Sequence, residues 1–458
     1  MRDDTIAALA TPPGVGAIGI VRLSGRDAIR IASRLFRARS GKRVEEFQSF
    51  RMYLGEIVDP KTGEPFDEAL CVVMRAPKSY TCEDVVEFHL HGGPLVLRKA
   101  LEACLGEGAR LARPGEFTER AFLNGRIDLT QAEAVATLVR ARSEKVLELS
   151  LRHLKGAFGE KVREWERRLL LLGAYIEASC DFLDASVENE EEYVRKEIAA
   201  LLVEIRTELD RSRRLQPLEE GMLVVIAGKP NVGKSSLLNL LVGKDRAIVT
   251  PFPGTTRDAI EEFVLLEGFP FRFVDTAGIR ESENPVERIG VERARNYLER
   301  ADWIVVVFDR SRPLEEEDVR LAELVRSRPH LVVLNKSDLP PALTREEVEE
   351  LYPGEPILEI SALTGEGREE LLAALLKRAQ ETVGPEEDLV LLTVRQREEL
   401  EGILRVLEEA WEAQESGVPL DVLGVLVEEA LAGMQRLTGE RMNEKLLETI
   451  FSHFCIGK

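Results

Sequence analysis

The pattern of hydrophobic and polar residues changes character along the chain. Up to about Asn124, short apolar runs alternate with turns. Ala17–Val21 and Leu70–Met74 are typical of strands, whereas Asp59-Pro60 and Gly92-Gly93-Pro94 are typical of turns. This alternation predicts a compact α/β unit at the start of the chain.

A helical pattern begins near Thr130. The run Thr130-Gln131-Ala132-Glu133 has the form of a capping box, which is typical of a helix start. From there to about Arg214 the apolar residues recur with helical periodicity, and Gly and Pro are scarce. Helical patterning resumes after Gly384-Pro385 and continues to about Phe451. We therefore expect long helices in both stretches.

The segment between the two helical stretches has its own pattern. It opens with Leu223–Ala227, a short apolar run of the kind that forms a buried strand. Because it interrupts helical sequence, we infer that helices from both flanks pack into one domain, with this segment inserted. The alternative is two separate helical domains. The predicted fold class is multidomain α/β, with an N-terminal α+β domain (1–122), an all-α domain in two parts (123–218 and 384–458) and an inserted α/β domain (219–383).

Composition excludes several classes of protein. No run of 18 or more apolar residues occurs, so no membrane span is expected, and the first residues lack the pattern of a signal peptide. The five cysteines are scattered without a CxxC pair, which indicates reduced thiols in a cytoplasmic protein. The formal net charge is -20, whereas a nucleic-acid coat protein is normally basic. Contact with RNA would therefore depend on local patches.

The inserted segment carries a phosphate-binding motif. The run from Gly228 to Ser235, GKPNVGKS, matches GxxxxGK[ST] between an apolar strand and an apolar helical run, which is the context that a P-loop requires. Its glycines let backbone N–H groups turn toward phosphate oxygens, and the helix start adds positive potential. We expect Lys234 to reach the β- and γ-phosphates and Ser235 to bind Mg²⁺.

A second motif, Asp275-Thr276-Ala277-Gly278, follows another apolar stretch. Asp275 would hold Mg²⁺ through water, and the Gly278 N–H would sense the γ-phosphate. Between this motif and the P-loop lies Gly254-Thr255-Thr256-Arg257-Asp258, where a threonine can close on Mg²⁺ and the γ-phosphate and so act as a switch.

The base-recognition motif is Asn335-Lys336-Ser337-Asp338, after the apolar run Leu331–Leu334. The Asp338 carboxylate can accept bonds from guanine N1–H and the 2-amino group, which adenine lacks; such a site rejects the wrong base by roughly 10⁴-fold or more. Lys336 would lie along the base plane, and Ser361-Ala362-Leu363 would close on guanine O6. Together the motifs predict a guanine-nucleotide hydrolase. The residues expected to bind GTP are Asn231, Val232, Gly233, Lys234, Ser235, Ser236, Thr250, Thr255, Thr256, Asp275, Thr276, Ala277, Gly278, Asn335, Lys336, Asp338, Ser361 and Ala362.

The position after Gly278 is Ile279, where other GTPases place a glutamine that orients water. Glu281, Glu283 and Glu287 lie nearby in the sequence. Any one of them taken alone is more simply a solvated surface charge. From the residues alone, the means of orienting water stays open.

Four segments are more distinctive: Thr5–Gly14, Arg113–Thr118, Gly254–Asp258 and Cys455–Lys458. Together they closely resemble the tRNA-uridine-modifying GTPases of the MnmE (TrmE) family, and the match runs from the N-terminus to Lys458. The first and last of these segments are much more specific than the P-loop.

The resemblance implies an N-terminal tetrahydrofolate-binding and dimerising domain, a helical domain and an inserted P-loop G domain. It implies a homodimer with K⁺-dependent GTP hydrolysis and a flavin-dependent partner of the MnmG (GidA) type. Together they would add a carboxymethylaminomethyl- or aminomethyl-type group to C5 of the wobble uridine of certain tRNAs. A 5-formyl- or methylene-tetrahydrofolate would provide the one-carbon unit.

The resemblance also implies roles for single residues. Arg22, Glu87, Arg126 and Lys458 would contact folate, the cations suiting its anionic glutamate tail and Glu87 the donor edge of the pterin. Arg22 is alternatively a surface charge, and Arg126 a helix-entry residue.

A monovalent-cation site is implied as well. Asn231 can ligate K⁺ from within the P-loop, and the family match extends the cage to Thr250, Phe252 and Thr255. Glu287 matches the residue that orients the attacking water, so the expected catalytic residues are Glu287, Lys234 and Thr256, with Ser235 and Thr256 as Mg²⁺ ligands.

Two questions stay open from the sequence. Cys455 is either a catalytic thiol, as has been considered in the family, or a tail cysteine packed against a neighbouring domain. The function is either tRNA modification, ribosome assembly by a related GTPase, or a GTP-switched scaffold without chemistry of its own. Folate binding separates the first function from the other two.

Overall fold

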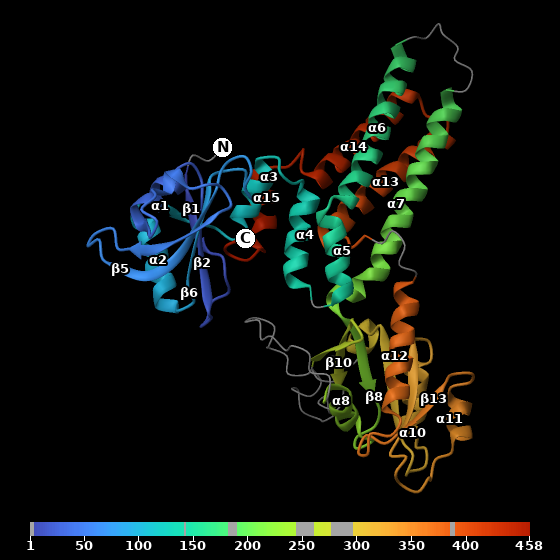
Figure 1. Cartoon of the computed structure of the whole chain (residues 1–458). Coiled ribbons are helices and arrows are strands. Elements are labelled where there is room, and N and C mark those ends of the chain that lie inside the picture. Colours follow the sequence, from blue (N-terminus) through green and yellow to red (C-terminus); the bar gives the residue numbers. More distant parts are fainter. Residues whose placement is uncertain (1–3, 142, 182–189, 244–260, 276–295, 385–389) are drawn as a thin grey trace, which may run out of the picture. The chain divides into compact units, whose positions relative to one another are not determined.

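The computed structural model describes residues 4–141, 143–181, 190–243, 261–275, 296–384 and 390–458. The chain forms two compact units (Figure 1). One comprises residues 1–139, 152–206 and 393–458, and the other residues 140–151 and 207–392. No helix among the described residues is both long enough and apolar enough to cross a membrane.

The first unit contains a seven-stranded sheet in the order β3-β4-β5-β6-β2-β1-β7. Neighbouring strands are antiparallel except for the β1–β7 pair, which is parallel. The strands are β1 (Ile6–Leu9), β2 (Ile18–Ser24), β3 (Phe36–Ala38), β4 (Met52–Val58), β5 (Pro65–Met74), β6 (Val85–His91) and β7 (Arg110–Leu111).

Two helices, α1 (Ala28–Leu35) and α2 (Pro94–Gly106), pack on this sheet through apolar side chains. Strand β2 alternates, so Val21 and Leu23 join the buried core while Arg22 lies on the other face. Gly19 allows α2 to approach closely, since a Cβ there would lie 2.5 Å from Leu97. The short helices η1 (Val44–Glu46) and α3 (Glu116–Leu123) complete this part.

Helices from both sides of the inserted segment pack together, as the sequence predicted. Helix α14 (Leu420–Thr438) packs against α6 (Ala157–Asp181) and α13 (Val394–Glu415). At the α13–α14 contact, a Cβ on Gly433 would lie 2.5 Å from Ile403, so the absence of a side chain sets the approach. The remaining helices of the two flanks are α4 (Leu129–Arg140), α5 (Glu144–Leu154), α7 (Glu190–Glu220) and α15 (Glu444–Ser452).

The cap of α4 differs from the expected one. Asp128 and Gln131 form the reciprocal box: the Gln131 N–H donates to Asp128 Oδ1 and the Asp128 N–H to Gln131 Oε1, both at 2.9 Å. The prediction of a box from Thr130 to Glu133 was therefore wrong by two residues. The carboxylate of Glu133 is buried and accepts two bonds of 2.7 Å from Arg395, so it is not available to the helix start.

The second unit contains a six-stranded sheet in the order β13-β12-β11-β8-β10-β9, parallel except for the antiparallel β9–β10 pair. The strands are β8 (Met222–Ala227), β9 (Glu261–Leu266), β10 (Phe269–Asp275), β11 (Trp303–Asp309), β12 (His330–Asn335) and β13 (Ile357–Ile360). Helices α8 (Lys234–Val242) and α12 (Arg368–Val383) pack with one apolar core, and α10 (Glu316–Val325) and α11 (Arg345–Leu351) with the other. The central strands are buried along their whole length, as expected for a parallel sheet covered on both faces.

Candidate functional site

The candidate nucleotide site lies at one edge of the second sheet. Parallel strands end together at that edge, because the register pairs Asp275 with Ile226 and Asp309 with Asn335. The motifs found in the sequence directly follow these strand ends. In open α/β sheets, ligands bind outside the carboxyl ends of the strands.

The P-loop connects β8 to α8 through residues with left-handed backbone. Gly233 caps the helix with φ +100°, and a Cβ there would lie 2.2 Å from the Asn335 side-chain nitrogen. Asn231 has φ +64°, a conformation that asparagine tolerates better than most residues. The loop therefore requires glycine at 233 and favours asparagine at 231.

The Lys234 ammonium is held inside this loop. Its side chain is buried, and Nζ donates to the carbonyl oxygens of Gly228 at 2.6 Å and Lys229 at 2.7 Å. Burial lowers the pKa of Lys234 from its ordinary value, and the Asp275 carboxylate acts in the opposite direction. A cation fixed at a helix N-terminus suits a phosphate group.

Ser235 and Asp275 place two oxygen ligands side by side. The Ser235 hydroxyl donates to Asp275 Oδ2 at 2.5 Å. Among the described residues, no group of three or more His, Cys, Asp or Glu side chains is arranged to hold a metal. A hydroxyl and a carboxylate fit Mg²⁺, which keeps waters and takes phosphate oxygens to complete its octahedron.

The base-recognition loop orients Asp338 through two further residues. The Thr364 N–H donates to Ser361 Oγ at 3.1 Å, and Ser361 donates to Asp338 Oδ1 at 2.5 Å. The side chain of Ser361 is fully buried, whereas Asp338 and Thr364 are exposed. This chain of bonds fixes the plane of the carboxylate expected to read guanine.

Asn335 joins three loops rather than pointing a free amide at a ligand. Its Nδ2 donates to the Val232 carbonyl at 2.8 Å, and its Oδ1 accepts the Ala362 N–H at 3.0 Å. The P-loop and both base-recognition loops are thus tied through one side chain. The sequence had identified these positions singly, and the structure brings them together.

Two contacts at this edge were not found from the sequence. Lys336, at φ +68°, donates to Asp309 Oδ2 at 2.5 Å. Burial acts to raise the pKa of Asp309, but the bonds from Lys336 and Ser311 outweigh it and hold this pKa below its ordinary value. Lys229 likewise pairs with the buried Asp318 at 2.6 Å. Asp309 ends β11 and Asp318 lies in α10, so both contacts depend on the folded structure and not on the local sequence.

Part of the predicted site lies outside the described residues. This applies to the switch and catalytic positions Thr250, Phe252, Thr255, Thr256, Thr276, Ala277, Gly278 and Glu287. Their roles stay predictions.

A second cluster gathers residues from both ends of the chain in the first unit. Arg22 donates from Nε to Glu87 Oε1 at 2.7 Å and from Nη1 to the Gly457 carbonyl at 3.2 Å. Glu87 also lies 3.2 Å from His89 Nε2. Gly457 has φ +90°, and a Cβ there would lie 2.1 Å from the Leu9 carbonyl oxygen. The segment 455–458 is therefore seated against β1 and β2.

Tyr80 connects this cluster to Arg126. The Arg126 guanidinium lies 4.9 Å from the centroid of the Tyr80 ring, and the phenol is 2.9 Å from Thr118 Oγ1. Burial raises the pKa of Tyr80, while Thr118, Arg126 and Arg22 act to lower it. Both predicted cations thus lie close enough to act on one phenol. Tyr80 was not predicted, because nothing in its local sequence marks it.

Lys458 and Cys455 are exposed, in the same segment as Gly457, which Arg22 contacts. The Cys455 carbonyl accepts the Gly115 N–H at 3.3 Å and the Lys458 N–H at 3.4 Å. The backbone of the segment is thus fixed while both side chains face outward.

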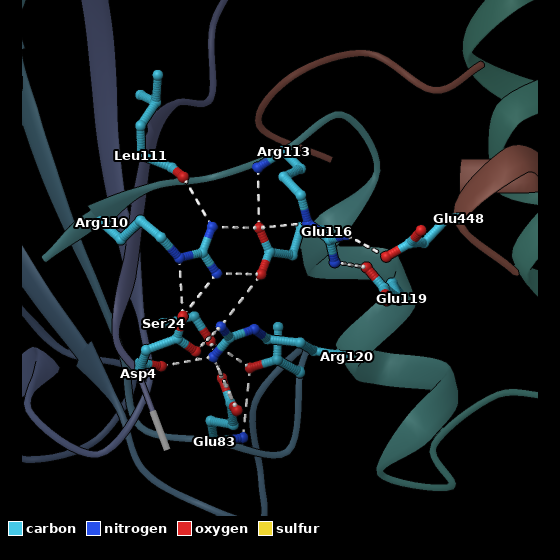
Figure 2. Close-up of polar contacts among 11 residues, drawn as sticks. Asp4, Ser24, Glu83, Arg110, Leu111, Arg113, Glu116, Glu119, Arg120 and Glu448 are labelled. Carbon is cyan, nitrogen blue, oxygen red and sulfur yellow. Dashed lines mark hydrogen bonds and ion pairs between the residues drawn. The ribbon is translucent and has the colours of Figure 1, made fainter. Parts of the chain in front are cut away.

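A network of arginines and carboxylates lies beside the seated segment 455–458 (Figure 2). At its centre Glu116, 1% exposed, accepts bonds from Arg110 at 2.6 Å and from the Arg113 N–H at 2.8 Å. Arg120 donates to Asp4 and to Glu116. Burial acts to raise the pKa of Glu116, but Arg110 and the Arg113 N–H outweigh it and lower this pKa to about 2.

The same network reaches the helix that precedes the seated segment. Arg113 donates to Glu119 at 2.7 Å and to Glu448 of α15 at 3.2 Å (Figure 2). Gly115, at φ +68°, leaves room for α15, since a Cβ would lie 2.7 Å from the Phe451 carbonyl. The motif Arg113–Thr118 therefore forms the surface on which α15 and the following residues rest.

Comparisons with known proteins match both units. Residues 5–126 match the family model described as GTP-binding protein TrmE N-terminus, and residues 129–455 match the MnmE helical domain. The tRNA modification GTPase MnmE of Geobacillus kaustophilus is 43% identical, with 99% of each chain covered. Those of Syntrophobacter fumaroxidans and Alkaliphilus oremlandii are 46% and 42% identical, with 98% or more of each chain covered.

The Glu116 network should make the free energy of unfolding depend on pH. The pKa of Glu116 is about 2 in the folded chain against an ordinary 4.5, so its contribution is present above about pH 4.5 and lost as pH falls toward 2. We predict that Glu116→Gln lowers the free energy of unfolding by ~3 kcal/mol at pH 7, since it removes a carboxylate from the buried Arg120 and from Arg110. Urea unfolding followed by circular dichroism should show the gap between wild type and variant closing between pH 4.5 and pH 2.

Glu448→Gln is the matched control, because it removes a carboxylate at the half-exposed rim of the same network. It should cost less than about 1 kcal/mol at any pH. An equal loss for both variants would show that burial of Glu116 is not what gives the network its strength.

Proposed function

Since this chain belongs to the MnmE family of tRNA modification GTPases, we propose that it couples GTP hydrolysis to modification of the wobble uridine of certain tRNAs. It acts in the cytoplasm as a homodimer with a flavin-dependent MnmG-type partner. The group added at C5 is of the carboxymethylaminomethyl or aminomethyl type. The observation that carries this proposal is the end-to-end match, which includes both the nucleotide edge and the seated segment 455–458.

In this proposal the sheet edge of the second unit binds GTP. Lys234 and the P-loop amides hold the phosphates, Ser235 and Asp275 hold Mg²⁺, and Asp338 pairs with guanine. Because Ser361 already orients Asp338, the carboxylate is arranged for the base before binding. Such preorganisation reduces the entropy lost when the ligand binds.

The cluster at Arg22 binds the folate. Three cations, Arg22, Arg126 and Lys458, suit an anionic glutamate tail, and Glu87 can accept from the donor edge of a pterin. Arg22 already holds both Glu87 and the seated segment. The bound folate supplies the one-carbon unit, and the protein fixes its orientation.

The function is tested by mass spectrometry of wobble nucleosides. A cell that lacks this protein should accumulate uridine without the C5 group in the affected tRNAs, and the intact chain should restore the modification. Unchanged nucleosides with defective ribosomal particles would instead support a role in ribosome assembly.

The preference for GTP over ATP tests the role of Asp338 in recognising the base. We predict that the wild type hydrolyses GTP at least about 10³-fold more efficiently than ATP, since adenine lacks the N1–H and 2-amino donors and would leave the Asp338 carboxylate unpaired. Asp338→Asn should shift preference toward xanthosine triphosphate, because an amide donates where the carboxylate accepted. Steady-state turnover with the three nucleotides measures this, and equal use of ATP and GTP by the wild type would contradict the assignment.

Folate binding tests the cluster at Arg22. Calorimetry with 5-formyltetrahydrofolate should show binding that Arg22→Ala weakens by about tenfold or more, since a charge-assisted contact is worth about 1.5–3 kcal/mol. Arg51→Ala is the matched control, because Arg51 is an exposed arginine that packs on Tyr53 of the same sheet. Equal affinities for the wild type and both variants would remove Arg22 from the site.

Turnover in K⁺ against Na⁺ tests the cation cage proposed at Asn231, Thr250, Phe252 and Thr255. A cation there would offset charge developing on the phosphates, and we predict about tenfold or greater stimulation by K⁺. Asn231→Gly should remove most of the difference, because glycine tolerates the φ of +64° while lacking the amide. Glu287→Ala should lose turnover and still bind GTP. Identical rates in both salts would exclude the cation.

A further inference from the structure

A dense cationic segment stands out on this acidic chain. Between Arg26 and Arg43 there are seven lysine and arginine residues and one carboxylate, Asp27, although the whole chain has a net charge of -20. The segment covers α1, β3 and the turn before η1. Neither the nucleotide edge nor the folate cluster uses any of these seven side chains.

Two cations share one face of α1. Arg30 and Arg34 lie one helical turn apart, about 6 Å along the axis, and Arg26 precedes the helix. The side chains of Arg26, Arg30 and Arg34 are 66%, 48% and 61% exposed. The opposite face of α1 is buried against the sheet. The arginines therefore project from a rigid support, as a stripe that Arg37 continues on β3.

A hollow of about 320 Å³ lies where this stripe meets the following turn. Arg37, Lys42 and Arg43 line it, with Glu45 as the single carboxylate on its wall. Gly41, at φ +74°, would have nothing within 4 Å of an added Cβ, so the turn is open at this point. A small anion can enter and meet several cations at once.

The existing partners of these cations are weak or absent. Arg30, Arg39 and Arg43 each pair with one exposed carboxylate, whereas Arg34 pairs with Glu107, whose side chain is 14% exposed. Such exposed pairs contribute about 0–1 kcal/mol each, so a phosphate can replace the carboxylate at little cost. In the part of the chain that the structure describes, Arg37 and Lys42 have no ion pair. The arginines around Glu116 differ, because the carboxylate that they share is buried.

We infer that this surface, Arg26–Arg43, binds the sugar-phosphate backbone of the tRNA substrate. A negatively charged protein can bind RNA only where cations are concentrated locally, and this segment meets that requirement. Consecutive phosphates along one strand match the spacing of Arg30 and Arg34 on α1, and the hollow receives a further phosphate. Contacts with the sugar-phosphate backbone do not distinguish one base from another. They therefore determine affinity and register rather than the choice of tRNA. The inference rests on the proposed function, whose substrate it places.

The test compares two charge-reversal variants of the full chain. Arg37→Glu/Lys42→Glu alters the surface, and Lys377→Glu/Arg405→Glu makes the same change of total charge at exposed positions elsewhere. Binding of a fluorescently labelled tRNA transcript is followed by anisotropy from 50 to 300 mM KCl. The first variant should weaken binding by about tenfold or more and reduce the slope of log K against log salt by about 1 to 2. The control should bind within about twofold of the wild type.

Other outcomes overturn the inference and identify what replaces it. Equal weakening by both variants would show a general charge effect, and no weakening by either would place the RNA elsewhere. Binding to phosphatidylserine vesicles that the first variant alone loses, with tRNA affinity unchanged, would assign the surface to lipid. A wild-type chain that does not bind tRNA also overturns the inference, and the wobble nucleosides then decide separately whether the proposed function stands. GTP turnover of both variants, measured alongside, shows that they are folded.

Discussion

One close approach of backbone to backbone determines how the first unit is built: Gly457 lies against Leu9, where no side chain fits. Only because residue 457 lacks a Cβ can Arg22 reach its carbonyl while also holding Glu87. Gly115 allows a second close approach of this kind, because its missing Cβ leaves room for the backbone of Phe451 in α15. Two glycines thus bring an exposed thiol and an exposed ammonium to the edge of the N-terminal sheet. A methyl group at either position would displace both.

Buried carboxylates then connect segments that are distant in sequence. Glu116 accepts hydrogen bonds from Arg110, Arg113 and Arg120 beside the seated segment 455–458. Glu133 connects α4 to α13 through Arg395. A buried ion pair contributes little net stability compared with an apolar pair, but removing one partner leaves an uncompensated charge. Such pairs therefore raise the free energy of alternative packings more than they lower that of the native packing.

The sequence predicted what is local and missed what depends on distant partners. The P-loop and the Asn335–Asp338 motif are short runs that follow apolar strands, so both motif and context are visible in the chain. The capping box was displaced because Arg395, 262 residues away, holds Glu133. Asp309 was missed for the same reason: its contact with Lys336 exists only once β11 and β12 pair in register. Likewise the role of Gly115 emerges only when α15 is in place, and that of Tyr80 only when Thr118 and Arg126 lie against it.

The bond from Arg22 to Gly457 spans 435 residues, and this separation has a consequence for synthesis. Ribosomes add about 5–20 residues per second, so the N-terminal sheet waits roughly 20–90 s for the residues that complete it. During that interval β1 and Arg22 face solvent without their final partner, although the strands around them have already emerged. The contact of segment 455–458 with β1 and β2 thus joins segments that are synthesised far apart in time. The contact between Arg22 and Gly457 can form only after the inserted domain between them has been made.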